Sequence, residues 1–224
     1  MNLHPCEVAG CAALRGPRTY SPYCQAHRLT QTRHGHPLQS PVRVHELLPF
    51  RATARALRKR NPDSAVWSVL HERWEALLGH ARGLLEARDS GKTFHAPTAQ
   101  AAEMLRRVAE RVEFAIVCEW QLAVLLFEAE NQARFKSDRA LRFALVRRLR
   151  LLAPVNVGTY WDHKRQRVTG VYRDAPPKAV DILGGWLVEV FGLAGRLLAE
   201  QERRRAQLSR EEQQRLVAAV AALR

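Results

Sequence analysis

A chain of 224 residues can form one substantial hydrophobic core with a small appendage. Since 46% of the residues are hydrophobic and only 12 are glycine, the composition excludes a disordered protein. The formal net charge of +14 predicts a polyanionic partner. Residues 1–60 contain ten Lys and Arg residues and two acidic residues. Residues 61–135 contain eight basic and eleven acidic residues, and residues 136–178 contain eleven basic and three acidic residues. Two basic segments therefore flank an acidic-to-neutral middle, which favours nucleic acid as the partner.

Three cysteines and a histidine near the N-terminus have the spacing of metal ligands. Cys6, Cys11, Cys24 and His27 follow the pattern C-x4-C-x12-C-x2-H in a stretch rich in Gly, Pro and Arg. Two thiolates from one turn, with a thiolate and an imidazole from another, complete a closed tetrahedral site that leaves no position for a substrate. A segment of about thirty residues with almost no apolar core needs another source of stability, and a bound metal ion can supply it. We predict a structural Zn²⁺ ion here.

Two alternatives apply to these ligands. Cys6–Cys11 or Cys11–Cys24 would be disulfides if the chain were secreted, and His4 is an alternative ligand to His27. The start MNLHPCEVAG has no apolar run and no basic leader, which favours a cytoplasmic protein with reduced thiols. Cys118 lies in a distant apolar run and is predicted to be a small buried hydrophobic residue.

The segments CEVAGC and YCQAHRLTQTRHGHP resemble the small zinc finger attached to phage-encoded HNH-type homing endonucleases and related mobile-element proteins. The family pattern is C…GC…LC..H…R.RHG.P. The four ligands match it, and so do Arg33, His34, Gly35 and Pro37 in the tail, while His36 replaces the usual acidic residue. The resemblance covers residues 4–38 and implies an accessory knuckle that contacts DNA or has a structural role. We expect a knuckle over residues 1–40 and a helical domain over residues 41–224.

The helical domain is expected to begin with a helix over residues 44–60 that Pro49 interrupts, since proline lacks the backbone donor. Asn61-Pro62 then predict the start of a second helix, with Asn as N-cap and Pro at the first helical position. Its apolar residues recur at three- and four-residue steps from Trp67 to Leu85. This pattern predicts a face that packs in the core.

A long helix is expected from about residue 98 to residue 134. Its middle, residues 114–127, is apolar nearly all round, which is typical of a central buried helix. The apolar stretch is too short to span a bilayer, and Glu119 interrupts it, so we predict no membrane segment there. The glutamates of this region lack the Glu-x-x-His pairs of a di-metal bundle, and most are expected to be solvated or paired with Arg106, Arg107 and Arg111.

The second basic segment, residues 137–174, predicts a basic helix followed by a hairpin. Asp138 can cap a helix to about Leu152, in which Arg139, Arg142, Arg147 and Arg150 fall within an arc of about 140°. Leu141, Leu145, Leu149 and Leu152 gather on the opposite side. The β-prone runs VGTYW and VTGVYR are separated by DHKRQR, which predicts a hairpin with a basic tip. The residues predicted to contact nucleic-acid phosphates are Arg28, Arg33, Arg139, Arg142, Arg147, Arg150, Lys164, Arg165 and Arg167.

The C-terminal region predicts two helices. The first begins near Pro177, and its glycines either permit close helix packing or mark a kink near Gly192. Ser209 and Glu212 have capping-box spacing for a last short helix, which could dock on the core or associate with a second copy of the chain.

Together these patterns predict a mainly α-helical bundle with a short β-hairpin and an N-terminal zinc knuckle. The sequence has no GxxxxGK[ST], GxGxxG, HExxH or GxSxG motif, which favours a protein that is not an enzyme. We expect a zinc-containing DNA-binding protein of a phage or mobile element. The alternatives are an adaptor or inhibitor that uses its basic surface against a host or virion protein, and a metal-dependent nuclease in which His163 is the candidate catalytic residue.

Overall fold

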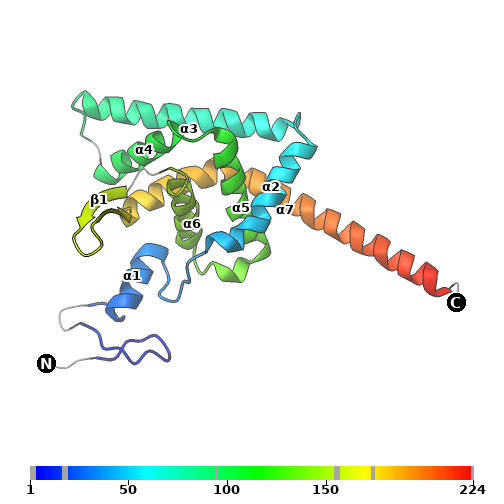
Figure 1. Ribbon diagram of the computed structural model, residues 1–224, viewed down its shortest axis with the longest axis horizontal. Helices are drawn as coiled ribbons and strands as arrows, with labels where there is room; N and C mark the ends of the chain where they lie inside the picture. Colours follow the sequence, from blue (N-terminus) through cyan, green and yellow to red (C-terminus); the bar gives the residue numbers. More distant parts are fainter. Residues whose placement is uncertain (1–3, 17–19, 94, 154–156, 173–174, 223–224) are drawn as a thin grey trace.

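The computed structural model describes residues 4–16, 20–93, 95–153, 157–172 and 175–222. Within these residues the fold is mainly helical with one hairpin, as predicted (Figure 1). The elements are α1 (Gln25–His34), α2 (Val44–Arg60), α3 (Ala65–Asp89), α4 (Ala96–Ala109), α5 (Phe114–Glu130), the 3-10 helix η1 (Gln132–Arg134), α6 (Asp138–Arg150), β1 (Val157–Asp162), β2 (Arg167–Tyr172) and α7 (Pro177–Ala222).

Helix α5 is the centre of the core. Every residue from Val117 to Phe127 is buried, which confirms the prediction of a central helix. Helix α5 packs against α2, α6 and α7, while α3 and α4 pack on each other and on α7. The predicted apolar face of α3 is confirmed, because Leu70, Trp74 and Leu85 are among its buried residues. Burial on all sides explains why the sequence of α5 shows no polar face.

The single helix predicted over residues 98–134 is wrong, because the chain forms α4, α5 and η1 instead. Residues 110–113 separate α4 from α5, and neither glycine nor proline is present there. The break allows Val108 in α4 and Val117 in α5 to be fully buried on helices that take different courses (Figure 1). Tertiary packing therefore overrides the helical propensity of this segment.

The predicted start of α3 and the predicted interruption at Pro49 are also wrong. Helix α2 continues through Pro49, and its buried residues lie on both sides of the proline. Packing of Leu47, Ala54 and Leu57 in the core holds the helix together despite the missing backbone donor. Asn61 ends α2, and Ser64 is the N-cap of α3.

Helix α7 is one continuous helix of 46 residues, so the predicted separate helix after Ser209 is wrong. Close packing, one of the two predicted roles of its glycines, is confirmed. A Cβ atom added at Gly184 would lie 2.9 Å from Cα of Arg142, and one added at Gly195 would lie 2.7 Å from Cβ of Leu125. The C-terminal part of α7 extends away from the other helices (Figure 1). Leu208, Leu216 and Val217 are exposed there, and association through this segment stays a prediction.

Part of α7, from Pro177 to Ala219, is long and apolar enough to cross a membrane by length and composition alone. Within this part, 56% of the 18-residue window with the highest hydropathy is buried inside the protein. A buried core helix of a soluble protein meets the same criterion, so this feature is weak evidence for a membrane span.

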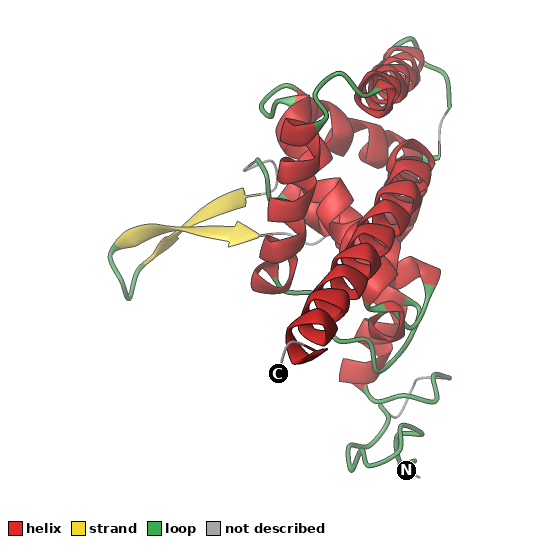
Figure 2. Ribbon diagram, turned by 90° about the vertical axis from the view of Figure 1, so that its right-hand side faces the viewer, coloured by secondary structure: helices red, strands yellow, loops and turns green. Residues whose placement is uncertain are grey.

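The hairpin predicted after α6 is confirmed. Strands β1 and β2 are antiparallel, and their register runs from Val157 opposite Tyr172 to Asp162 opposite Arg167. At the turn, Oδ1 of Asp162 accepts hydrogen bonds from the backbone amides of Lys164 (3.0 Å) and Arg165 (3.2 Å). Figure 2 shows that the hairpin projects from the helical body. Its basic tip is thereby presented away from the core.

Candidate metal centre and basic surface

The first half of the candidate metal centre is a tight turn that holds Cys6 and Cys11. The backbone amide of Cys6 donates to the carbonyl of Ala13 (3.0 Å), and the amide of Cys11 donates to the carbonyl of Val8 (3.0 Å). Gly10 has φ +77°, a left-handed conformation that glycine adopts without steric cost. This turn brings both cysteines to one side of the segment.

The second half is the beginning of α1. Cys24 is the N-cap residue of α1, and His27 lies one helical turn later on the same face. The backbone amide of Glu7 donates to the carbonyl of Pro22 (3.0 Å), which joins the two halves. In addition, the backbone amide of Cys24 donates to Sγ of Cys6 at 3.3 Å.

The four predicted ligand atoms converge on one point. The three Sγ atoms and one ring nitrogen of His27 all lie within 4.8 Å of one another. Nδ1 of His27 is 3.4 Å from Sγ of Cys6 and 3.4 Å from Sγ of Cys24. Zinc–sulfur bonds of about 2.3 Å and zinc–nitrogen bonds of about 2.0 Å at tetrahedral angles would separate S and N by about 3.5 Å. The geometry therefore fits one tetrahedrally bound metal ion.

The thiols of the site differ in acidity. Burial opposes ionisation of Cys6, but hydrogen bonds from the backbone amides of Cys24 and Val8, together with His27, lower its pKa to about 6. For Cys11 the backbone amide of Ala13 lowers the pKa, yet burial and the neighbouring Cys6 and Cys24 raise it above its ordinary value. Amide hydrogen bonds thus stabilise the thiolate of Cys6, and the negative charge already present nearby disfavours ionisation of Cys11. A divalent cation would relieve that crowding.

The alternative assignments of these residues are not supported by the geometry. All four cysteines are free thiols, so neither predicted alternative disulfide is formed. His4 is exposed and does not belong to the group of converging ligands. Cys118 is buried in α5 with 2% of its surface exposed, as predicted, and burial raises its pKa to about 12. In the part of the chain that is described, no second group of three or more His, Cys, Asp or Glu side chains converges in this way.

The tail of the knuckle attaches it to α6. The hydroxyl of Ser137 donates to the carbonyl of His34, and the ring of His34 packs edge-on against Phe143 with centroids 4.2 Å apart. Gly35 ends α1 with φ +73°, and a Cβ atom there would lie only 2.9 Å from Oγ of Ser137. His34 and Gly35 therefore have a structural role, because their contacts fix the orientation of α1 on the helical domain.

The structure brings together α1 and α6, two of the three elements predicted to bind nucleic acid. Nη1 of Arg139 donates to the carbonyl of Thr32 in α1 at 3.4 Å. Arg33 and Arg147 are exposed, and Arg28 is half-buried. The hairpin residues Lys164, Arg165 and Arg167 are exposed on the separate, projecting element.

Three of the predicted arginines in α6 are buried, half-buried or ion-paired in the structure. Arg150 is only 4% exposed, so its predicted place on an exposed basic face is wrong. It is the last residue of α6 and follows Leu149, which is also buried. Arg142 is half-buried against Gly184 of α7, and Arg139 forms an ion pair with Asp181 at 2.5 Å. The predicted apolar side is confirmed, since Leu145 and Leu149 are fully buried.

A second group of arginines surrounds Glu119 and Trp120 in α5. The buried carboxylate of Glu119 lies 3.1–3.4 Å from guanidinium nitrogens of Arg51, Arg55 and Arg58 in α2. The Trp120 ring carries Arg148 at 3.7 Å and Arg51 at 4.5 Å from its centroid. The local sequence pattern does not reveal this group, because it joins α2, α5 and α6.

Pairing within a helix is confirmed for Glu103, which binds Arg106 and Arg107.

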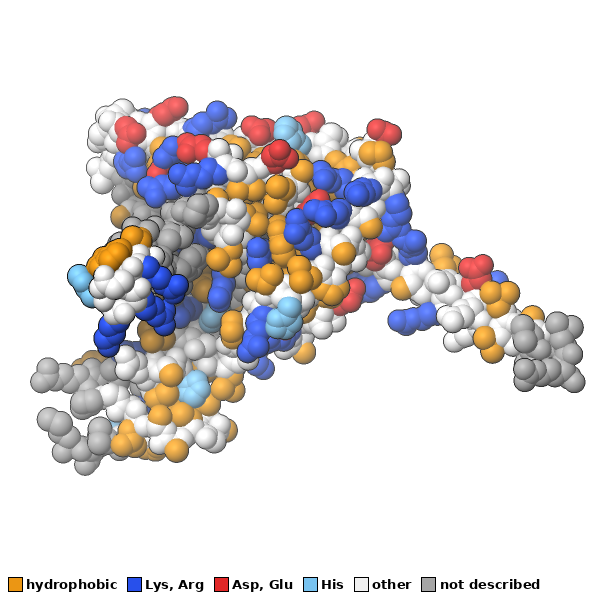
Figure 3. All heavy atoms as spheres, viewed as in Figure 1, with side chains coloured by type: hydrophobic (Ala, Val, Ile, Leu, Met, Phe, Trp, Pro, Cys, Tyr) orange, Lys and Arg blue, Asp and Glu red, His pale blue; other side chains and the backbone are white. Residues whose placement is uncertain are grey.

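Figure 3 shows Lys and Arg side chains on the hairpin and across the middle of one face, interspersed with hydrophobic side chains. Acidic side chains gather mainly along the upper edge of that face, where α3 runs (Figures 1 and 3). Comparison of the chain with protein-family models, curated proteins and solved structures found no match.

Proposed function

We propose that this chain is a zinc-containing, non-enzymatic DNA-binding protein in which the metal centre anchors one of two basic regions. The observation that carries the proposal is the contact between α1 and α6. It joins a basic N-terminal segment to a second basic segment more than a hundred residues later in the chain. A Cys3His donor set with tetrahedral spacing is typical of structural zinc.

The projecting hairpin supports a second contact with the phosphate backbone. Lys164, Arg165 and Arg167 are exposed, and only Arg165 has a carboxylate near it, with Asp162 at 3.9 Å among the described residues. Exposed cations on a projecting element can approach phosphates without first breaking ion pairs. The resemblance of residues 4–38 to the zinc finger of HNH-type proteins supports an origin in a phage or mobile element.

Binding of single- and double-stranded probes by fluorescence anisotropy, over a series of salt concentrations, tests the proposal. Each phosphate contact contributes a slope of about −0.9 to log K against log[salt], so replacing Lys164, Arg165 and Arg167 by alanine should reduce the slope by up to about 3. Replacing Arg82, Arg111 and Arg203 by alanine is the matched control, because it removes the same charge from exposed positions outside both basic segments.

The control variant should bind with an affinity close to that of the wild type. Binding that does not depend on salt, or an equal loss in both triple variants, would contradict the proposal. A stoichiometric protein retained from nuclease-treated lysate, with no probe binding, would instead favour the adaptor function.

A further inference from the structure

A cavity of about 310 Å³ lies between the tail of the knuckle, the first turn of α2 and one side of α6. Val42, Leu47 and Phe143 contribute apolar walls. The volume is at the lower end of the range of about 300–1,000 Å³ for small-molecule sites. The cavity is formed only where the attached tail of the knuckle closes one side of it, and it is distinct from the metal centre.

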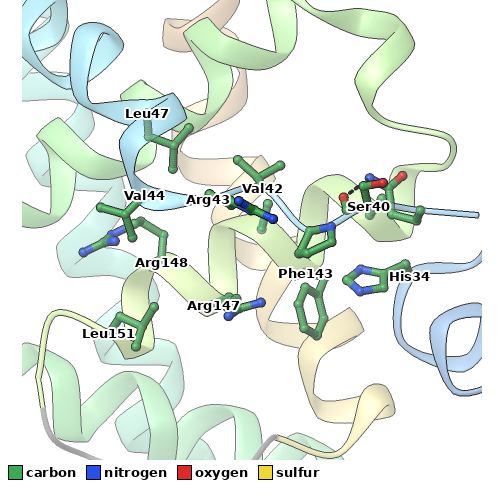
Figure 4. Close-up of a pocket in the computed structure, with 14 residues that line it drawn as sticks. His34, Ser40, Val42, Arg43, Val44, Leu47, Phe143, Arg147, Arg148 and Leu151 are labelled. Atoms are coloured by element: carbon green, nitrogen blue, oxygen red, sulfur yellow. Dashed lines mark hydrogen bonds between the residues drawn. The ribbon is translucent and has the colours of Figure 1, made fainter. Parts of the chain in front are cut away.

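Three arginines line this cavity and no acidic residue does. Figure 4 shows Arg43 and Arg147 on opposite sides of the same space, with Phe143 and His34 at one end and Arg148 with Val44 and Leu151 at the other. Among the described residues, none of these three guanidinium groups forms an ion pair with a carboxylate. The nearby Glu46 is already engaged by Arg134 at 3.1 Å and by the backbone amide of Arg43 at 2.6 Å.

The Arg148 side chain beside this cavity has an unsatisfied hydrogen-bond donor. Its Nε atom is buried and has no hydrogen-bond partner within the described part of the chain. Its guanidinium lies over Trp120, whose ring also carries Arg51. Burial, and then the charge of Arg51, lower the pKa of Arg148 from its ordinary value. A guanidinium that is partly buried beside another cation is unfavourable, and an anion bound next to it would offset that cost.

We propose that this cavity binds a small phosphate ester that carries one planar ring, in the manner of a nucleoside monophosphate. Guanidinium groups bind phosphate oxygens through paired hydrogen bonds, which suits Arg43 and Arg147 on opposite sides of the cavity. A ring can pack on the apolar walls around Phe143, while the phosphate lies between Arg43 and Arg147. The cavity has room for one phosphate group with one ring, and a longer nucleotide chain does not fit inside it. This inference goes beyond the proposed function and does not depend on it. The ligand is either a free mononucleotide or the terminal nucleotide of a strand.

Isothermal titration of the full-length, metal-loaded protein with AMP, adenosine and inorganic phosphate tests the proposal. AMP should bind saturably, and adenosine and phosphate should each bind at least about 10-fold more weakly, since each lacks half of the contacts. The Arg43→Gln/Arg147→Gln variant should lose about 10–100-fold in affinity for AMP. Ala144→Leu should weaken AMP binding without a change of charge, because Ala144 lines the cavity.

The matched control is Arg82→Gln/Arg111→Gln, which removes the same charge from exposed sites away from the cavity. Circular dichroism and metal content establish that each variant is folded. Competition by a 5′-phosphorylated oligonucleotide, but not by its unphosphorylated form, would support the proposal and identify a strand terminus as the ligand. Competition by mononucleotides alone would support it and identify a free nucleotide. Absence of saturable AMP binding to the wild type, or an equal loss in the control, would overturn it.

Discussion

Substitution of Cys24 by serine should remove the metal and unfold the knuckle while the helical body remains folded. Serine is nearly the same size as cysteine and is a preferred N-cap residue, so the change preserves the start of α1 and removes one thiolate ligand. Among the described residues of the knuckle, the apolar cluster has three buried members, Cys6, Val8 and Cys24. Burial of one valine contributes about 1.5–3 kcal/mol, whereas a structural zinc ion contributes about 10–16 kcal/mol at neutral pH. A bound zinc ion would therefore stabilise the knuckle severalfold more than its apolar cluster does.

Elemental analysis and hydrogen exchange measure this effect. The wild type should hold one zinc per chain, and Cys24→Ser should lose at least about 100-fold in zinc affinity, since even residues that only orient a ligand are worth about 10–100-fold. The amides of Cys6, Glu7 and Cys11 should lose protection, because their hydrogen bonds to Ala13, Pro22 and Val8 exist only in the folded knuckle. The buried amides of α5 should stay protected.

Cys118→Ser is the control for a cysteine outside the site. It places a hydroxyl in the core and should cost about 1–3 kcal/mol of stability, yet it should leave the zinc content unchanged. Full zinc content in Cys24→Ser, or a knuckle that stays protected after chelation, would refute the reasoning. Loss of zinc from Cys118→Ser would show that metal content follows overall stability and not the ligand set.

Three further predictions concern the helical body and are measured by chemical denaturation. Gly184→Ala should destabilise the protein by about 1–3 kcal/mol, because the new methyl group would overlap α6. In the control Gly185→Ala, the new methyl group meets nothing within 4 Å, so this change should stabilise the protein by about 0.5–1 kcal/mol. Equal effects of the two substitutions would argue against the close packing of α6 and α7. Glu119→Gln should cost about 2 kcal/mol, because it leaves three arginines around an uncharged side chain; no loss relative to the exposed Glu75→Gln would contradict that role. Hydrogen bonds from Arg106, partly opposed by burial, lower the pKa of Glu103 to about 2 from an ordinary value of 4.5, so its stabilisation is fully present above about pH 4.5 and lost as the pH falls through 2. Because Arg106 is 41% exposed, we expect at most about 2 kcal/mol between wild type and Glu103→Gln at pH 7 and none near pH 2; pH profiles that stay parallel would disprove the linkage.

Local patterns in the sequence were sufficient to predict the group of candidate metal ligands and most of the helical elements. The spacing of Cys6, Cys11, Cys24 and His27 predicted a group that the fold does bring together. The all-apolar stretch of α5 and the hairpin after α6 were also predicted correctly. In each case the signal lies in neighbouring residues, since ligand spacing, periodicity and turn composition are properties of a short segment.

Where helices break and which arginines are buried could not be predicted in this way. Residues 110–113 contain no helix-breaking residue, and Ser209 has capping-box spacing that the continuous α7 does not use. The helical periodicity that predicted an exposed position for Arg150 describes an isolated helix. The burial of Arg150 depends on how α6 packs against the core.

The sequence alone therefore determined the candidate metal site and the helical class of this protein, because those depend on short-range covalent spacing and on local periodicity. Only the tertiary structure decided that α1 lies against α6, that Glu119 binds three arginines of α2, and that Arg43 and Arg147 face one cavity. These features join residues that are from about 60 to more than 100 positions apart, and their free energy comes from burial and charge pairing that exist only once the helices have packed.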